Sequence, residues 1–125
     1  MDITIKNLAV SYEALANQAI NFNRSYLQLL KMYEELILAP DWFDELEKSG
    51  NSLLKTIASM QQEQKNIVSK FQDLSKLITK AKLNFTNNPE AEELQNINND
   101  CQVMIDFVKT IDLLDLQNMF MAIKN

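Results

Sequence analysis

The feature that most constrains the fold is an apolar repeat through the first 36 residues. Its members are spaced alternately by four and three residues, which is the heptad spacing of helices that pack side by side. A second apolar row lies one position beyond it, so this helix is predicted to contact more than one neighbour. The repeat comprises Met1, Ile5, Leu8, Tyr12, Leu15, Ala19, Phe22, Tyr26, Leu29, Tyr33 and Leu36, and the second row Ala9, Ala16, Leu30 and Ile37.

The first helix is predicted at residues 4–38, because Thr4 can cap its start and Pro40 disfavours helix at the residue before it. Asp41 then takes the N-cap position of a second helix, predicted at residues 42–85. This second helix carries its own heptad repeat, which comprises Phe43, Leu46, Leu53, Ile57, Met60, Ile67, Phe71, Leu74, Ile78, Ala81 and Phe85.

Two positions weaken the second repeat. Gly50 lies in the segment 48–52, which has the composition of a turn. The unbroken register favours a continuous helix there, locally weakened or kinked. Gln64 indicates either a solvated layer or a polar residue that fixes the register of the helices.

The third helix is predicted at residues 89–110, since Asn88 can cap it, Pro89 suits its first position and glutamates follow in its first turn. Its repeat comprises Leu94, Ile97, Cys101, Met104, Val108 and Ile111.

The register of the third helix then fails at Asp115, and a new one begins. This slip predicts a break near residues 110–115 and a short fourth helix at residues 112–124, with Thr110 or Asp112 as its cap. The new repeat comprises Leu113, Leu116, Phe120 and Ile123.

These segments predict one all-α domain over residues 1–125, an antiparallel bundle of three long helices with a short C-terminal fourth helix and coiled-coil-like heptad packing. At about 1.5 Å per residue the third helix covers only part of the hairpin formed by the first two. The end near Pro40 is covered only if the fourth helix continues along it. Otherwise a second copy of the chain or a different protein is needed.

Composition excludes most catalytic and metal sites. The chain has no histidine, and its single cysteine, Cys101, excludes paired-cysteine motifs. Cys101 occupies a heptad position, so it is predicted to be a buried small apolar residue. The first two repeats contain no carboxylate, whereas a di-metal bundle would place several there. We therefore expect a non-enzymatic protein without metal, cofactor or small-molecule substrate.

Charge and hydropathy argue against nucleic-acid and membrane binding. The net charge of −5 disfavours a phosphate-binding surface. The longest apolar run, at residues 119–123, is too short to span a bilayer, and the first residues do not resemble a signal peptide. A cytoplasmic protein is expected. The lysines of the second helix alternate with polar residues and predict a solvated face; they include Lys65, Lys70, Lys76, Lys80 and Lys82.

Apolar surfaces remain as candidate binding sites for another protein. The segment 111–125 places Leu114, Met119, Phe120 and Met121 on several sides of one helix, which suits an adaptable binding surface. The alternative is a helix buried between two others or in a homodimer.

Trp42 and Phe43, at the corner after Pro40, form the second candidate. Trp42 either braces the corner against Ile37 and Leu38 or anchors a partner there.

A long helix, a corner with the sequence Trp42-Phe43-Asp44-Glu45-Leu46 and a second long helix resemble flagellar type III export chaperones of the FliT/FlgN class, over residues 8–85. The resemblance implies a small cytoplasmic chaperone that holds a secretion substrate in helical grooves. It also implies that a C-terminal helix masks the binding surface, the place taken here by residues 111–125.

The prediction is thus a protein-interaction module of bacterial or phage origin, a chaperone or adaptor holding a partner protein in a helical groove. Two alternatives remain open. One is a phage-borne or immunity-type inhibitor that binds and blocks an enzyme, and the other is a self-associating structural protein.

Overall fold

The computed structural model of the protein describes residues 2–38, 40–85 and 88–124. These residues form four helices: α1 (Asp2–Leu38), α2 (Trp42–Lys82), α3 (Asn88–Lys109) and α4 (Leu113–Lys124). The described ranges contain no strand, which confirms the predicted all-α class. Within these ranges, the structure does not describe the side chains of residues 2–4, 42–43, 45–47, 49–51, 88 and 123–124.

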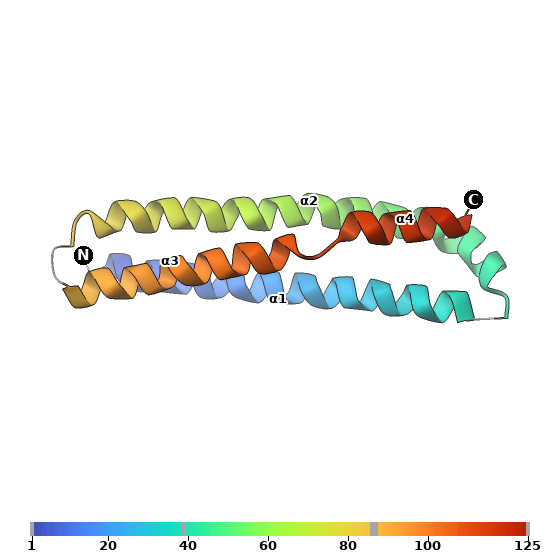
Figure 1. Ribbon diagram of the computed structural model, residues 1–125, viewed down its shortest axis with the longest axis horizontal. Coiled ribbons are helices and arrows are strands. Elements are labelled where there is room, and N and C mark those ends of the chain that lie inside the picture. Colours follow the sequence, from blue (N-terminus) through green and yellow to red (C-terminus); the bar gives the residue numbers. More distant parts are fainter. Residues whose placement is uncertain (1, 39, 86–87, 125) are drawn as a thin grey trace.

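The helices form an elongated antiparallel bundle (Figure 1). α1 and α2 make a long hairpin, and α3 returns along both of them from the end that holds the N-terminus. α4 continues in the same direction and packs mainly on α2, toward the corner between α1 and α2. The predicted bundle with a short fourth helix is therefore confirmed, and α4 covers the part of the hairpin that α3 does not reach.

α2 ends at Lys82, three residues before the predicted end. The N–H groups of Leu83, Asn84 and Phe85 donate to carbonyls three residues back at 3.0–3.2 Å, so the chain tightens into a turn. Phe85 still packs, half-buried, against the core. The other helix ends lie within two residues of their predicted positions.

The first of the two weak positions of α2 does not interrupt the helix. The helix is continuous through residues 48–52, as the unbroken register predicted. Figure 1 shows its first turns inclined to the rest. Asp41 precedes the helix as predicted, but its side chain makes no capping hydrogen bond.

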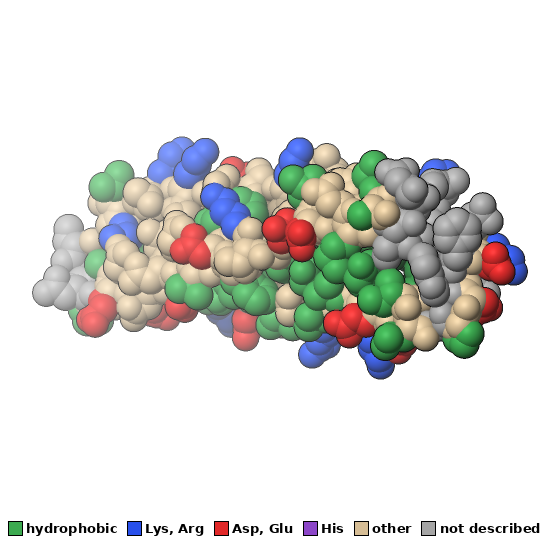
Figure 2. Space-filling model, turned by 45° about the vertical axis from the view of Figure 1, so that its right-hand side comes forward, with side chains coloured by type: hydrophobic (Ala, Val, Ile, Leu, Met, Phe, Trp, Pro, Cys, Tyr) green, Lys and Arg blue, Asp and Glu red, His purple; other side chains and the backbone are tan. Residues whose placement is uncertain are grey.

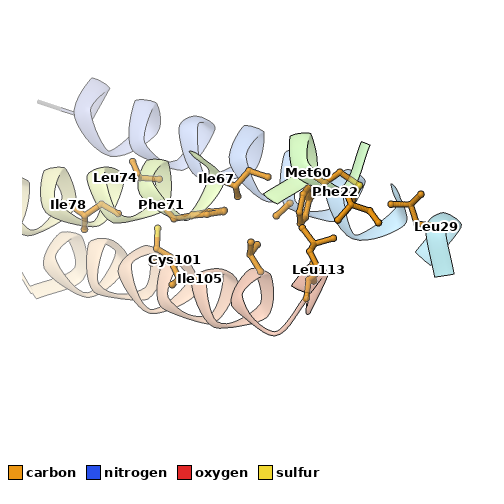
Figure 3. Packing of buried hydrophobic residues seen from close by; sticks show 14 of the residues in the cluster. Phe22, Leu29, Met60, Ile67, Phe71, Leu74, Ile78, Cys101, Ile105 and Leu113 are labelled. Atoms are coloured by element: carbon orange, nitrogen blue, oxygen red, sulfur yellow. The ribbon is translucent and has the colours of Figure 1, made fainter. Parts of the chain in front are cut away.

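The core consists of heptad residues from all four helices (Figure 3). Phe71 of α2 is fully buried, and its ring meets that of Tyr12 edge-on, with centroids 6.1 Å apart. Cys101 of α3 points toward Phe71 in Figure 3 and is also fully buried, as predicted. Ile105 is buried although it lies outside the predicted repeat. None of the described polar or charged residues is buried, so apolar packing alone fills the interior.

Candidate functional site

The link between α3 and α4 consists of residues 110–112. Asp112 caps α4, because its Oδ1 accepts the backbone N–H of Asp115 at 2.9 Å. The hydroxyl of Thr110 instead donates to the carbonyl of Phe107 at the end of α3. Of the two predicted caps, Asp112 is therefore the correct one. Asp115 itself is exposed, in agreement with the register break predicted there.

Gln64 of α2 fastens this link. Its Nε2 donates to the carbonyls of Val108 and Ile111, both at 2.8 Å. Each carbonyl also accepts a backbone N–H at 3.2 Å, that of Ile111 on Val108 and that of Leu113 on Ile111, so the amide adds a second bond to both acceptors at the end of α3. Of the two predicted roles for Gln64, the structure supports the residue that fixes the register.

α4 docks on the hairpin through a narrow apolar row. Leu113, Leu116 and Phe120 are at most 2% exposed. Figure 3 places Leu113 against Phe22 and Met60, between α1 and α2. The ring of Phe120 meets that of Tyr33 edge-on, with centroids 5.3 Å apart. Gln61 and Gln117 add an amide hydrogen bond of 3.4 Å between α2 and α4.

Half-buried apolar residues form a row on α1, the helix of the hairpin that α4 contacts less than α2. We call this set the α1 row. Burial, followed by the carboxylates of Asp112 and Asp115, raises the pKa of Tyr26 in this row. Figure 2 shows hydrophobic side chains gathered between the levels of α1 and α4, with charged side chains of both signs interspersed elsewhere on that face. The α1 row consists of Tyr26, Leu30, Tyr33 and Leu36.

The predicted partner-binding residues lie in different environments. Leu114 is 61% exposed and Met121 44% exposed, on the outside of α4. Met119 is half-buried. Phe120 is only 1% exposed, so it contacts the hairpin and not a partner while α4 is docked. Trp42 begins α2, but its side chain lies outside the described residues.

Phe43 follows Trp42 in the first turn of α2, and its side chain likewise lies outside the described residues. The roles proposed for these two aromatic residues stay predictions.

A second surface, the α2–α3 groove, runs along the junction of these two helices. Three adjoining hollows make it up, with volumes of about 610, 310 and 420 Å³. Gln64, Lys65 and Lys109 line both of the first two hollows, and Gln72 and Lys109 join the second to the third. The hollows therefore follow one another from Gln102 on α3 to the α3–α4 link.

The α2–α3 groove carries positive charge. Lys65 and Lys76 of α2 and Lys109 of α3 line it, and none of them forms an ion pair with any residue that the structure describes. Its one carboxylate, Asp112, already caps α4. Sequence reasoning missed this surface because it considered the lysines of one helix, whereas Lys109 joins them from another.

Among the titratable groups that the structure describes, the thiol of Cys101 has the largest pKa shift. Burial, followed by the carboxylate of Asp100, raises the pKa of the Cys101 thiol from 9.0 to about 11. Because the folded state holds the proton more tightly, this group stabilises the fold below pH 9. That contribution is lost as the pH rises toward 11.

We expect Cys101 to resist thiol reagents in the folded protein. At pH 8 its raised pKa lowers the thiolate fraction about a hundredfold relative to an ordinary thiol, and burial slows access further. The release of colour from dithionitrobenzoate measures the rate, and the same protein in urea is the control. Equal rates with and without urea would contradict the packing of Cys101.

Among the described residues, no cluster of three or more His, Cys, Asp or Glu side chains is placed to hold a metal ion. None of the described helices combines the length and apolar content needed to cross a bilayer. Comparisons with protein-family models, curated proteins and solved structures found no match to this chain.

Proposed function

We propose that the protein is a non-enzymatic chaperone or adaptor that binds a partner protein on the part of the hairpin that α4 covers. The break between α3 and α4 carries this proposal. α4 has 12 residues, and isolated helices of that length are marginal in water. Its helical structure therefore depends on docking, and an undocked α4 would leave an apolar surface open to a partner.

Few contacts hold α4 on the hairpin, which supports the proposal that a partner can displace it. Leu113, Leu116 and Phe120 are the fully buried side chains among its described residues. A partner helix that replaced α4 would gain the same apolar surface on the hairpin. A partner that bound beside α4 would instead gain the α1 row, together with the exposed Met121.

The proposed setting is the cytoplasm of a bacterium or of a phage-infected cell. The resemblance of residues 8–85 to flagellar export chaperones supports this setting. The presence of a single cysteine, which suits a reducing compartment, supports it as well.

Leucines 77 and 116 provide a matched test. Leu116 of α4 is 1% exposed and Leu77 of α2 is 56% exposed, so Leu116→Ser weakens docking while Leu77→Ser leaves it intact. Partner affinity scales with the fraction of molecules whose binding surface is open. We therefore expect Leu116→Ser to bind its partner at least about tenfold more tightly than the unmodified chain.

The measurement is affinity capture from the source organism with mass spectrometry, followed by titration of the captured partner. Circular dichroism must confirm that α1, α2 and α3 of the Leu116→Ser variant stay helical. Leu77→Ser should capture the same partner at the level of the unmodified chain. Weaker capture by a folded Leu116→Ser variant would show that docked α4 belongs to the binding surface, contrary to the proposal.

A further inference from the structure

We infer that the α2–α3 groove binds an acidic peptide segment of a partner protein. This surface differs from the one under α4, and its use requires no movement of α4. On α2 the lining residues run from Gln61 to Lys76, a rise of about 22 Å at 1.5 Å per residue. An extended segment of about seven residues spans that length.

The positive charge of the groove favours an acidic segment as its ligand. Lys65, Lys76 and Lys109 place three cations along it that are unpaired among the described residues, while the chain as a whole carries a net charge of −5. An acidic segment is therefore opposed by the net charge of the chain and attracted to these three cations. Such contrast directs a charged partner to one site and fixes its orientation.

The uncharged residues of the groove suit a peptide chain. Ser69 and Gln72 line it and make no side-chain hydrogen bond with any other described residue, so their polar groups are open to a peptide backbone. Val68 is half-buried and Ile105 is 4% exposed, and both supply apolar contact within the groove. These features favour a segment in which acidic and apolar residues alternate.

A nucleic acid fits this surface less well than an acidic peptide. Nucleic-acid-binding proteins neutralise many phosphates with lysine and arginine, whereas the groove offers three lysines and no arginine. The surrounding net negative charge also opposes a phosphate backbone, which carries a charge at every nucleotide.

Selection from a display library of random ten-residue peptides on the full chain tests the inference. We expect the recovered peptides to be enriched in Asp and Glu. The strongest peptide is then synthesised with a fluorescent label, and its dissociation constant is measured by anisotropy. Lys65→Gln combined with Lys109→Gln should weaken binding at least about tenfold, and higher salt should weaken it further.

The control combines Lys70→Gln with Lys80→Gln, two exposed lysines of α2 that do not line the described hollows. It changes the net charge by the same amount and should alter the affinity less than about twofold. Three results would overturn the inference: recovered peptides without acidic enrichment, equal losses in the two double variants, or an oligothymidine that binds more tightly than the peptide and displaces it.

Discussion

Replacement of Phe71 by alanine is expected to lower the free energy of unfolding by about 3–5 kcal/mol, the usual cost of deleting a fully buried aromatic ring. Phe71 is 0% exposed. Its ring lies edge-on to Tyr12 of α1 and faces Cys101 of α3 (Figure 3). Since these contacts belong to three helices, the cavity left by alanine cannot be filled by the movement of one of them. Urea denaturation followed by circular dichroism measures the change.

Leu77→Ala is the matched control for Phe71→Ala. Leu77 lies on the same helix and is 56% exposed. Its replacement by alanine should change the free energy of unfolding by no more than about 0.5 kcal/mol. A loss below about 1 kcal/mol for Phe71→Ala would contradict the three-helix packing at this level of the bundle.

Gln64→Ala is expected to cost about 1–3 kcal/mol, because it removes two hydrogen bonds that contribute about 0.5–1.5 kcal/mol each. The two acceptors of the Gln64 amide are the carbonyls of Val108 and Ile111. Each carbonyl keeps a backbone N–H donor in the variant, so what is lost is the attachment of the link to α2. Hydrogen exchange should therefore rise most at the end of α3 and in α4, and urea denaturation gives the overall change.

Gln62→Ala controls for the loss of a glutamine from α2. The amide of Gln62 donates to Asn66 on the exposed side of the same helix, at 3.3 Å. Its removal should change stability by no more than about 0.5 kcal/mol and leave exchange in α4 unchanged. If the Gln64 and Gln62 variants behave alike, the link between α3 and α4 is not fastened by Gln64.

The number of helices and most of their ends could be predicted, because local signals determine them. Heptad spacing identifies the buried face of each helix, and Pro40 ends the first one through its own backbone chemistry. The end of α2 was predicted too late because Phe85 keeps the apolar spacing. The carbonyls of the last turn nevertheless accept the N–H groups of a tight turn there.

The surface on which α4 packs is determined by contacts with residues far away in the sequence, which no local pattern contains. Its apolar row was visible in the sequence, but the sequence does not state which surface of the hairpin receives it. The same holds for Gln64, whose polar character was evident while its acceptors lie on another helix. Phe120 was predicted on a partner-binding surface because the apolar residues of α4 lie on several sides of the helix, and one groove cannot bury all of them. The structure buries it and leaves Leu114 and Met121 outside.

The α2–α3 groove escaped prediction for a related reason. Heptad position tells whether a lysine borders the core, but it does not tell which residue of the next helix lies at the same height. Lys65 and Lys109 are 44 positions apart in the chain and meet only because α3 returns along α2. The identity of a binding partner is harder still to predict from the sequence, since it depends on a second molecule.

Under the proposed function, the short link at residues 110–112 also sets how strongly α4 competes with a partner for the surface that it covers. A helix held by a short link has an effective concentration in the millimolar range, which a free competitor rarely reaches in a cell. A partner must therefore bind the hairpin much more tightly than α4 does, or bind beside α4 first and gain a tether of its own. Only a partner with two points of attachment escapes this handicap without unusual affinity.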